Sequence, residues 1–152
     1  MSLVIDQSGG AQPILTISGD RHAVGTGANL IAIPGPLQPI LTITPADDAS
    51  KSFSLIGLDV LTLPDISEFV LLKNATLTGA SFQAVNGSQM TYDKAATAVT
   101  GGVQVDVGFA LNQTRVNIYL IPFGVGDSFT LCIAGQEGEA TKASGSLRWI
   151  EQ

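Results

Sequence analysis

The chain has 152 residues, with 7 basic and 13 acidic side chains, a net charge of -6 and 45% hydrophobic residues. A chain of this length can bury a hydrophobic core without disulfide bonds or metal ions to stabilise it. Its excess of acidic side chains argues against a protein that binds nucleic acid or anionic lipid through a basic face. The single cysteine, Cys132, excludes an intrachain disulfide and a cysteine zinc site, and the single histidine, His22, excludes most metalloenzymes and Ser-His-Asp enzymes.

Residues 1–45 are rich in proline and poor in charge. They hold five of the seven prolines but only three charged side chains. Prolines at this density disfavour helices and central strands, yet the segment is too apolar to be disordered by composition. We therefore expect an extended N-terminal arm that packs onto a partner. The side chains expected to make this contact are Pro13, Ile14, Leu15, Ile17, Ile31 and Ile33.

A short repeat lies within this arm. Residues 12–17 read Gln-Pro-Ile-Leu-Thr-Ile, and residues 38–43 repeat those six residues in order. The repeat indicates either two equivalent strands that dock on equivalent surfaces, or two ordinary strands that share favoured residues. A second alternative concerns the boundary of the arm: residues 39–44 already begin the folded domain, and only residues 1–36 form the arm.

From residue 50 onward, apolar and polar residues alternate with a period of two, which predicts strand after strand. The alternation is strict over residues 103–109, 115–120, 128–133 and 147–149. The segments 51–57, 59–63 and 68–72 alternate less cleanly, as is typical of strands buried on both faces. We expect an all-β, antiparallel β-sandwich (jelly-roll-like) of roughly eight to eleven strands over residues 46–152, preceded by the arm.

One hairpin is predicted at Asn86-Gly87. A two-residue loop would place Phe82 opposite Thr91 and the apolar faces out of phase. A three-residue loop over residues 85–87 places Phe82 opposite Met90 and gives Gly87 the left-handed conformation. We therefore expect the three-residue loop.

Residues that carry enzyme chemistry are few and form no motif. His22 follows Asp20 and Arg21, a setting typical of a solvated turn. Glu137 and Glu139 flank a glycine and would bind calcium weakly, although exposed turn carboxylates are the more ordinary interpretation. The sequence contains no Gly-x-Ser-x-Gly elbow. We expect no enzymatic activity, no catalytic or metal-binding residue and no cofactor.

Sugar-binding sandwiches bind through exposed aromatic rings, for which only three tryptophan or tyrosine side chains are available. Trp149 shares the face of Leu147 and is expected in the core, whereas Tyr119 points away from its apolar neighbours and is expected outside. The third, Tyr92, lies on the predicted hairpin. Cys132 is expected to be either a buried, inert thiol or an interface thiol.

The bulk composition predicts a surface that is partly covered by other subunits. Charged residues make up 13% of the chain, about half the usual share, and the mean hydropathy is +0.33. No apolar run is long enough for a transmembrane helix, and the N-terminus lacks the features of a signal peptide. We expect a homo-oligomer, a trimer before a dimer, that contacts neither nucleic acid nor membrane.

A small, acidic, all-β chain with a Pro/Gly-rich apolar N-terminal segment and Ala/Thr/Gly/Val-rich strands resembles the auxiliary virion proteins of tailed bacteriophages. Capsid decoration (cement) proteins and head fibres are the nearest kinds. The final strand, Ala-Ser-Gly-Ser-Leu-Arg-Trp-Ile-Glu-Gln at residues 143–152, is also typical of phage virion proteins. The resemblance covers the whole chain in style, matches no signature motif and assigns no functional residue.

The resemblance implies a non-enzymatic protein that is made in the host cytoplasm and sits on the virion surface. There it would bridge subunits of the major capsid protein as a homo-oligomer, often a trimer. The alternative is a carbohydrate- or receptor-binding β-sandwich of a tail-associated protein or an adhesin.

Overall fold

The computed structural model describes residues 2–6, 14–27, 29–33, 37–135 and 141–152, with residues 2–6, 14–18, 65, 111, 112 and 119 described by their backbone alone. In these ranges the regular secondary structure consists of strands, and the strand pairs are antiparallel. The expected all-β, antiparallel sandwich is confirmed. No helix in the described ranges is long and apolar enough to cross a membrane.

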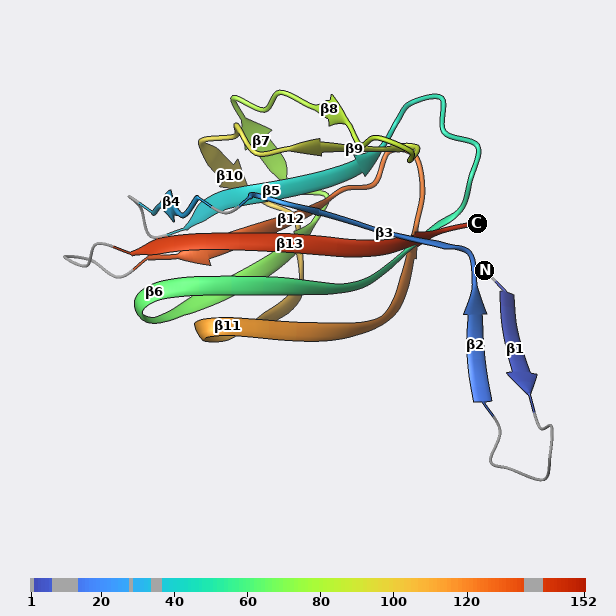
Figure 1. Cartoon of the computed structure of the whole chain (residues 1–152). Helices are drawn as coiled ribbons and strands as arrows, with labels where there is room; N and C mark the ends of the chain where they lie inside the picture. The colour runs from blue at the N-terminus through green and yellow to red at the C-terminus, as the bar shows by residue number, and fades with distance from the viewer. Residues whose placement is uncertain (1, 7–13, 28, 34–36, 136–140) are drawn as a thin grey trace.

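Thirteen strands follow one another along the described chain (Figure 1). They are β1 (Ser2–Asp6), β2 (Ile14–Ser18), β3 (Asp20–Gly25), β4 (Ile31–Ala32), β5 (Gln38–Pro45), β6 (Phe53–Lys73), β7 (Thr76–Thr78), β8 (Gln83–Ala84), β9 (Met90–Asp93), β10 (Ala98–Thr100), β11 (Val103–Phe123), β12 (Phe129–Ala134) and β13 (Lys142–Glu151).

Two long strands, β6 and β11, run through both layers of the sandwich. Residues 53–63 of β6 pair with β13, whereas residues 68–73 pair with β12. β11 follows β6 around the same corner, where the register shifts between Ala110 and Asn112. The first layer therefore has the order β3-β13-β6-β11, and the second has the order β11-β6-β12-β5-β9-β8. Strands that change layer at a bend or bulge are a known way to close a sandwich corner.

The main core lies between these two layers. Trp149 of β13, expected in the core, is 0% exposed and confirms that prediction. The other large side chains that are completely or almost completely buried come from both layers: Phe53, Phe129, Ile40, Leu41, Ile43, Leu55, Leu58, Leu71, Met90, Leu131 and Ile133. These side chains come from four strands, β5, β6, β9 and β12, and their burial explains why segments that alternate poorly still form strands.

A smaller core covers the opposite face of the second layer. Val70, Leu72 and Cys132 pack there against Ala75 and Val99, which lie beside and on the paired strands β7 and β10. Cys132 is buried, and this burial raises the pKa of its thiol to about 12. Of the two expectations for this residue, the buried, inert thiol is therefore correct.

The predicted arm boundary at residue 45 is wrong, and so is the alternative boundary at residue 36. β3 and β4 pair with β13, and β5 lies between β12 and β9. Pro39 is tolerated in this inner strand because it sits where the register with β12 shifts, between Leu131 and Cys132. Within the described chain, the β1–β2 hairpin is the part of the N-terminal segment that forms a separate sheet (Figure 1).

The predicted hairpin at Asn86-Gly87 has a longer loop than expected. Val85 N–H donates to the Met90 carbonyl at 3.0 Å, which leaves residues 86–89 as a four-residue loop. Gly87 has a φ of +77°, in the left-handed region as predicted. The predicted pairing of Phe82 with Met90 is wrong, because the Ser88 hydroxyl accepts the Met90 N–H at 2.9 Å and stabilises the larger loop.

Candidate functional site

The residues predicted to bind a partner divide into three groups. Pro13 lies outside the described residues, and Ile14, Leu15 and Ile17 lie in β2, which is described by its backbone. Ile33 is buried in the main core, and Ile31 packs against that core from β4. The prediction for Ile31 and Ile33 is therefore wrong, because the pairing of β4 with β13 places them inside this chain's own sandwich.

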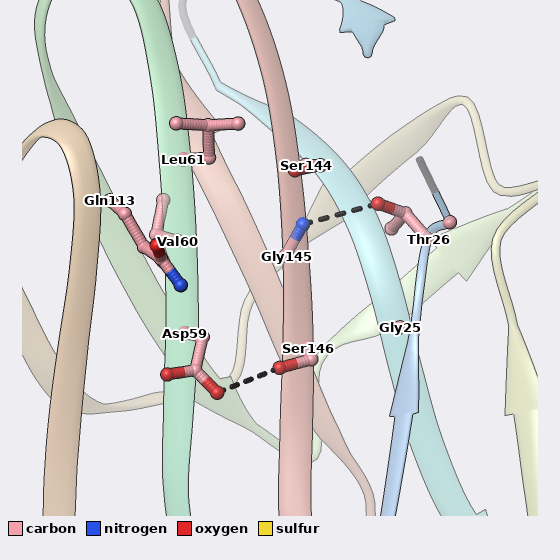
Figure 2. Close-up of a pocket in the computed structure, with 10 residues that line it drawn as sticks. Gly25, Thr26, Asp59, Val60, Leu61, Gln113, Ser144, Gly145 and Ser146 are labelled. Carbon is pink, nitrogen blue, oxygen red and sulfur yellow. Dashed lines mark hydrogen bonds between the residues drawn. The ribbon is translucent and has the colours of Figure 1, made fainter. Parts of the chain in front are cut away.

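A small pocket of about 350 Å³ opens at the first layer (Figure 2). It is lined mainly by small and polar residues of four strands and the turn after β3: Gly25, Thr26, Gly27, Asp59, Val60, Leu61, Gln113, Ser144, Gly145 and Ser146. Thr26 fastens the end of β3 to β13, since its hydroxyl accepts the Gly145 N–H at 3.1 Å. The described lining residues present hydroxyl and amide groups and no aromatic ring, a lining that suits a small polar ligand.

Asp59 is the charged residue of this pocket, and its carboxylate is already engaged. Ser146 donates to Oδ2 at 3.0 Å, and Arg115 Nε donates to Oδ1 at 2.9 Å. Arg148, which is mostly buried, places its Nε 3.4 Å from Oδ2 and donates from Nη2 to the Val116 carbonyl at 3.1 Å. Both carboxylate oxygens of Asp59 are therefore taken up by groups of β11 and β13, and the side chain holds these two strands to β6.

We expect Asp59→Ala to lower the free energy of unfolding by about 1–3 kcal/mol, because it leaves the largely buried Arg148 without its carboxylate. Arg115→Ala is the matched control. Its side chain is mostly exposed, so its removal is expected to change the stability by less than about 1 kcal/mol. Urea denaturation of both variants at one pH measures the difference. Equal losses would contradict the assignment of Arg148 as the dependent partner.

A second polar cluster surrounds the buried Glu151 at the end of β13. Trp149 Nε1 donates to Glu151 Oε1 at 3.0 Å, the Ser88 hydroxyl donates to the same oxygen, and Gln89 N–H donates to Oε2 at 3.4 Å. His22 stacks on Trp149 with ring centroids 5.8 Å apart and places Nε2 3.9 Å from Oε2. Desolvation by itself raises the pKa of Glu151, but these donors outweigh it, so the pKa lies below its usual value.

The Glu151 cluster is a structural clasp between the two layers. It connects the last strand of the first layer with the β8–β9 loop of the second layer, through Ser88 and Gln89. The expectation that His22 lies in a solvated turn is wrong, since His22 lies in β3 opposite Trp149 and is only partly exposed. No sequence signal points to this cluster, because residues 22, 88–89 and 149–151 lie far apart in the chain and no motif links them.

The third feature is the free edge formed by β11. Among the described strands, β11 pairs with β6 alone, so its other backbone edge is unpaired over both layers. Three apolar side chains at its start are exposed: Val103 at 67%, Val107 at 44% and Phe109 at 71%. The strict alternation over residues 103–109 predicted a strand, which is confirmed, but these three apolar side chains of it lie exposed.

A hydrogen bond of Asp106 indicates which backbone N–H groups of β11 point away from β6. The backbone N–H of Val107 donates to Asp106 Oδ1 at 2.9 Å in an exposed contact, which indicates that this N–H points to the open side of β11. Backbone groups two residues apart in a strand point to the same edge. The N–H groups of Val107 and Phe109 therefore face away from β6, toward the unpaired side.

The aromatic and acidic residues singled out from the sequence do not converge. Tyr92 is partly buried and donates to Gln83 at 3.0 Å, while the side chain of Tyr119 is outside the description. Glu137 and Glu139 also lie outside the described residues. In the part of the chain that the structure covers, no three His, Cys, Asp or Glu side chains gather as a metal site would require.

Comparisons of the chain with protein-family models, with curated proteins and with solved structures found no match. The surfaces of the molecule that bear on its function are the pocket beside Asp59, the Glu151 cluster and the β11 edge. Of these, the β11 edge is unpaired, whereas the charged groups at the pocket and at the clasp already have partners within the chain.

Proposed function

We propose that the protein is a non-enzymatic structural component of a viral particle that decorates the capsid surface. In this role it is a homo-oligomer, a trimer before a dimer, and it stabilises the particle by bridging major capsid subunits. The observation that carries the proposal is the unpaired β11 edge with its exposed Val107 and Phe109. Exposed apolar surface on a sheet edge is typical of a site that another chain covers.

Two further observations support this proposal. The β1–β2 hairpin forms its own sheet beside the sandwich, as an attachment arm would (Figure 1). The acidic groups best placed for chemistry, Asp59 and Glu151, are held by internal donors and serve to fasten strands together. Such groups favour a rigid binding protein over an enzyme, whose acid or base must be free to exchange a proton.

The test is to purify virus particles from cells that produce this chain from its native genome. We expect immunogold labelling of the chain over the whole capsid surface and a regular copy number by quantitative mass spectrometry. An unrelated protein of the same cells serves as the control for carry-over. If the chain stays with the free cellular protein and is missing from the particles, the proposal is wrong.

The carbohydrate- or receptor-binding alternative retains one supporting observation, the hydroxyl-lined pocket beside Asp59 (Figure 2). Against it, Trp149 is buried in the core, and no aromatic side chain is among the described residues that line the pocket. Labelling confined to the tail tip, together with a glycan-array signal that Gln113→Ala removes, would favour this alternative. Gln113 is suitable because it lines the pocket from an exposed position on β11.

A further inference from the structure

We propose that the free edge of β11 over residues 103–110 accepts β2 from a second copy of this chain, so that copies assemble by strand addition. This inference rests on the proposed structural function and names the contact through which the homo-oligomer forms. Strand addition combines main-chain hydrogen bonds, which hold the added strand, with side-chain contacts that select it.

The acceptor is defined by the unpaired side of β11. The outward N–H of Val107 donates to the Asp106 side chain, a bond that an added strand would replace. The side chains of Val107 and Phe109 are exposed next to it. An added strand would lie next to both side chains, as cross-strand neighbours do in an antiparallel or parallel pair. The edge from Val103 to Ala110 is about 26 Å long, and β2, with five residues, spans about 17 Å, so β2 fits within it.

The donor is identified by the internal repeat. Residues 38–43 and 12–17 share the sequence Gln-Pro-Ile-Leu-Thr-Ile. In the first of these, β5, the sequence forms a strand with partners on both sides, since Leu41 lies opposite Leu131 and Ile43 lies opposite both Phe129 and Tyr92. Its copy in β2 pairs with β1 alone among the described strands. The same sequence therefore has a neighbouring strand on both sides in β5, but on one side only in β2 among the described strands.

The topology requires that the β2 strand come from another copy. β2 ends at Ser18 and β3 begins at Asp20, so a single residue, Gly19, joins the hairpin to β3. β3 lies at the opposite side of the first layer from β11, with β13 and β6 between them, and the acceptor residues 103–110 lie beyond the corner, where β11 pairs with β6 in the second layer. The three strand spacings across the first layer alone amount to about 14 Å, which one linking residue cannot span. The free edges of β2 and β11 in one molecule are thus kept apart, and both become filled when copies associate.

This contact joins different surfaces of the two copies, so it is a head-to-tail contact. Such a contact generates a closed ring when the rotation between copies closes, which agrees with the trimer proposed above. It differs from a two-fold contact between two β11 edges, in which the hairpin has no part. The experiment below separates these two arrangements.

The test uses two variants that each lack one half of the contact. The edge variant carries Val107→Lys and Phe109→Lys, which place charges on the exposed edge while the hairpin stays intact. The hairpin variant lacks residues 2–18 and retains the intact edge. Among the described strands, the two that it removes pair only with each other. Val125→Lys is the matched control, because Val125 is 50% exposed but lies in the turn after β11.

We expect light scattering to find the wild type and Val125→Lys as oligomers, and each of the two variants alone as a monomer. Mixing the two variants is expected to restore a one-to-one complex, because the hairpin of the edge variant can occupy the edge of the hairpin variant. The edge substitutions should weaken self-association about 30-fold or more. Asp106→Ala is expected to strengthen it several-fold, since no carboxylate then has to be desolvated at the edge.

Other outcomes overturn the inference. A monomeric wild type, a hairpin variant that still oligomerises, or a mixture that stays monomeric would each exclude β2 addition. Near-UV circular dichroism checks that the variants are folded, and Thr16→Pro in β2 replaces the deletion if that variant does not fold. The two proposals can fail separately. If the chain still labels the virus particles but the mixing experiment fails, the proposed function stands and β2 addition is wrong. If the mixing experiment succeeds but the chain is missing from the particles, only the proposed function is refuted.

Discussion

Trp149→Ala is expected to lower the free energy of unfolding by about 3–5 kcal/mol, the range for removing a large buried aromatic side chain. Trp149 is fully buried between the layers, where its ring stacks on His22 and its N–H donates to Glu151 at 3.0 Å. The substitution removes the packing volume and one donor of the clasp together. Since a small domain is stable by about 5–15 kcal/mol, this loss is a large part of the total.

Urea denaturation monitored by far-UV circular dichroism measures this loss, because the variant no longer has the only tryptophan. Phe109→Ala is the matched aromatic control. Its ring is 71% exposed on the β11 edge, so its removal is expected to change the stability of the separated monomer by less than about 0.5 kcal/mol. A Trp149→Ala loss no larger than that of Phe109→Ala would show that the indole is not a core residue.

Glu151→Gln is expected to remove part of the acid sensitivity of the fold. Burial opposes the charge of Glu151, but the donors Ser88, Trp149 and Gln89 outweigh it and hold its pKa below the ordinary value of 4.5. A carboxylate with a lowered folded-state pKa stabilises the protein above its ordinary pKa. That contribution is lost as the pH falls through the folded-state value. The wild type should therefore lose stability below about pH 4.5 more steeply than Glu151→Gln.

At pH 7 the same variant is expected to be less stable than the wild type by about 1–3 kcal/mol, since its donors lose a charged acceptor. Asp127→Asn is the control for acid sensitivity elsewhere. Hydrogen bonding by the Asn74 side chain lowers the pKa of Asp127 as well, so Asp127 contributes in the same direction at a second site. Unfolding free energies of the three proteins at pH 7 and pH 3 check the expectation. An unchanged pH dependence in Glu151→Gln would contradict it.

Much of the local structure follows from the sequence. Period-two alternation predicted strands where β11, β12 and β13 occur, and the shared parity of Trp149 and Leu147 predicted that both are buried. The left-handed conformation of Gly87 followed from the Asn-Gly pair. These predictions succeed because each depends on the conformational preference of a few consecutive residues or on the two faces of one strand.

The features that bear on function depend on the tertiary structure. The alternation at Val107 and Phe109 is the same as in a buried strand, and only the order of the strands leaves their strand at an edge. The proline-rich composition of residues 1–45 predicted an arm, but pairing with β13, β12 and β9 placed β3, β4 and β5 inside the sandwich.

The two polar clusters were also decided by the tertiary structure. Asp59 meets Arg115 and Arg148 because β6 lies between β11 and β13. Glu151 receives Ser88 because the β8–β9 loop closes over the end of β13. The sequence by itself determined which segments become strands and which face of most strands is apolar. Which strands become neighbours, and which edge is left without one, depends on pairings between distant segments, and these are selected by the packing of the whole core.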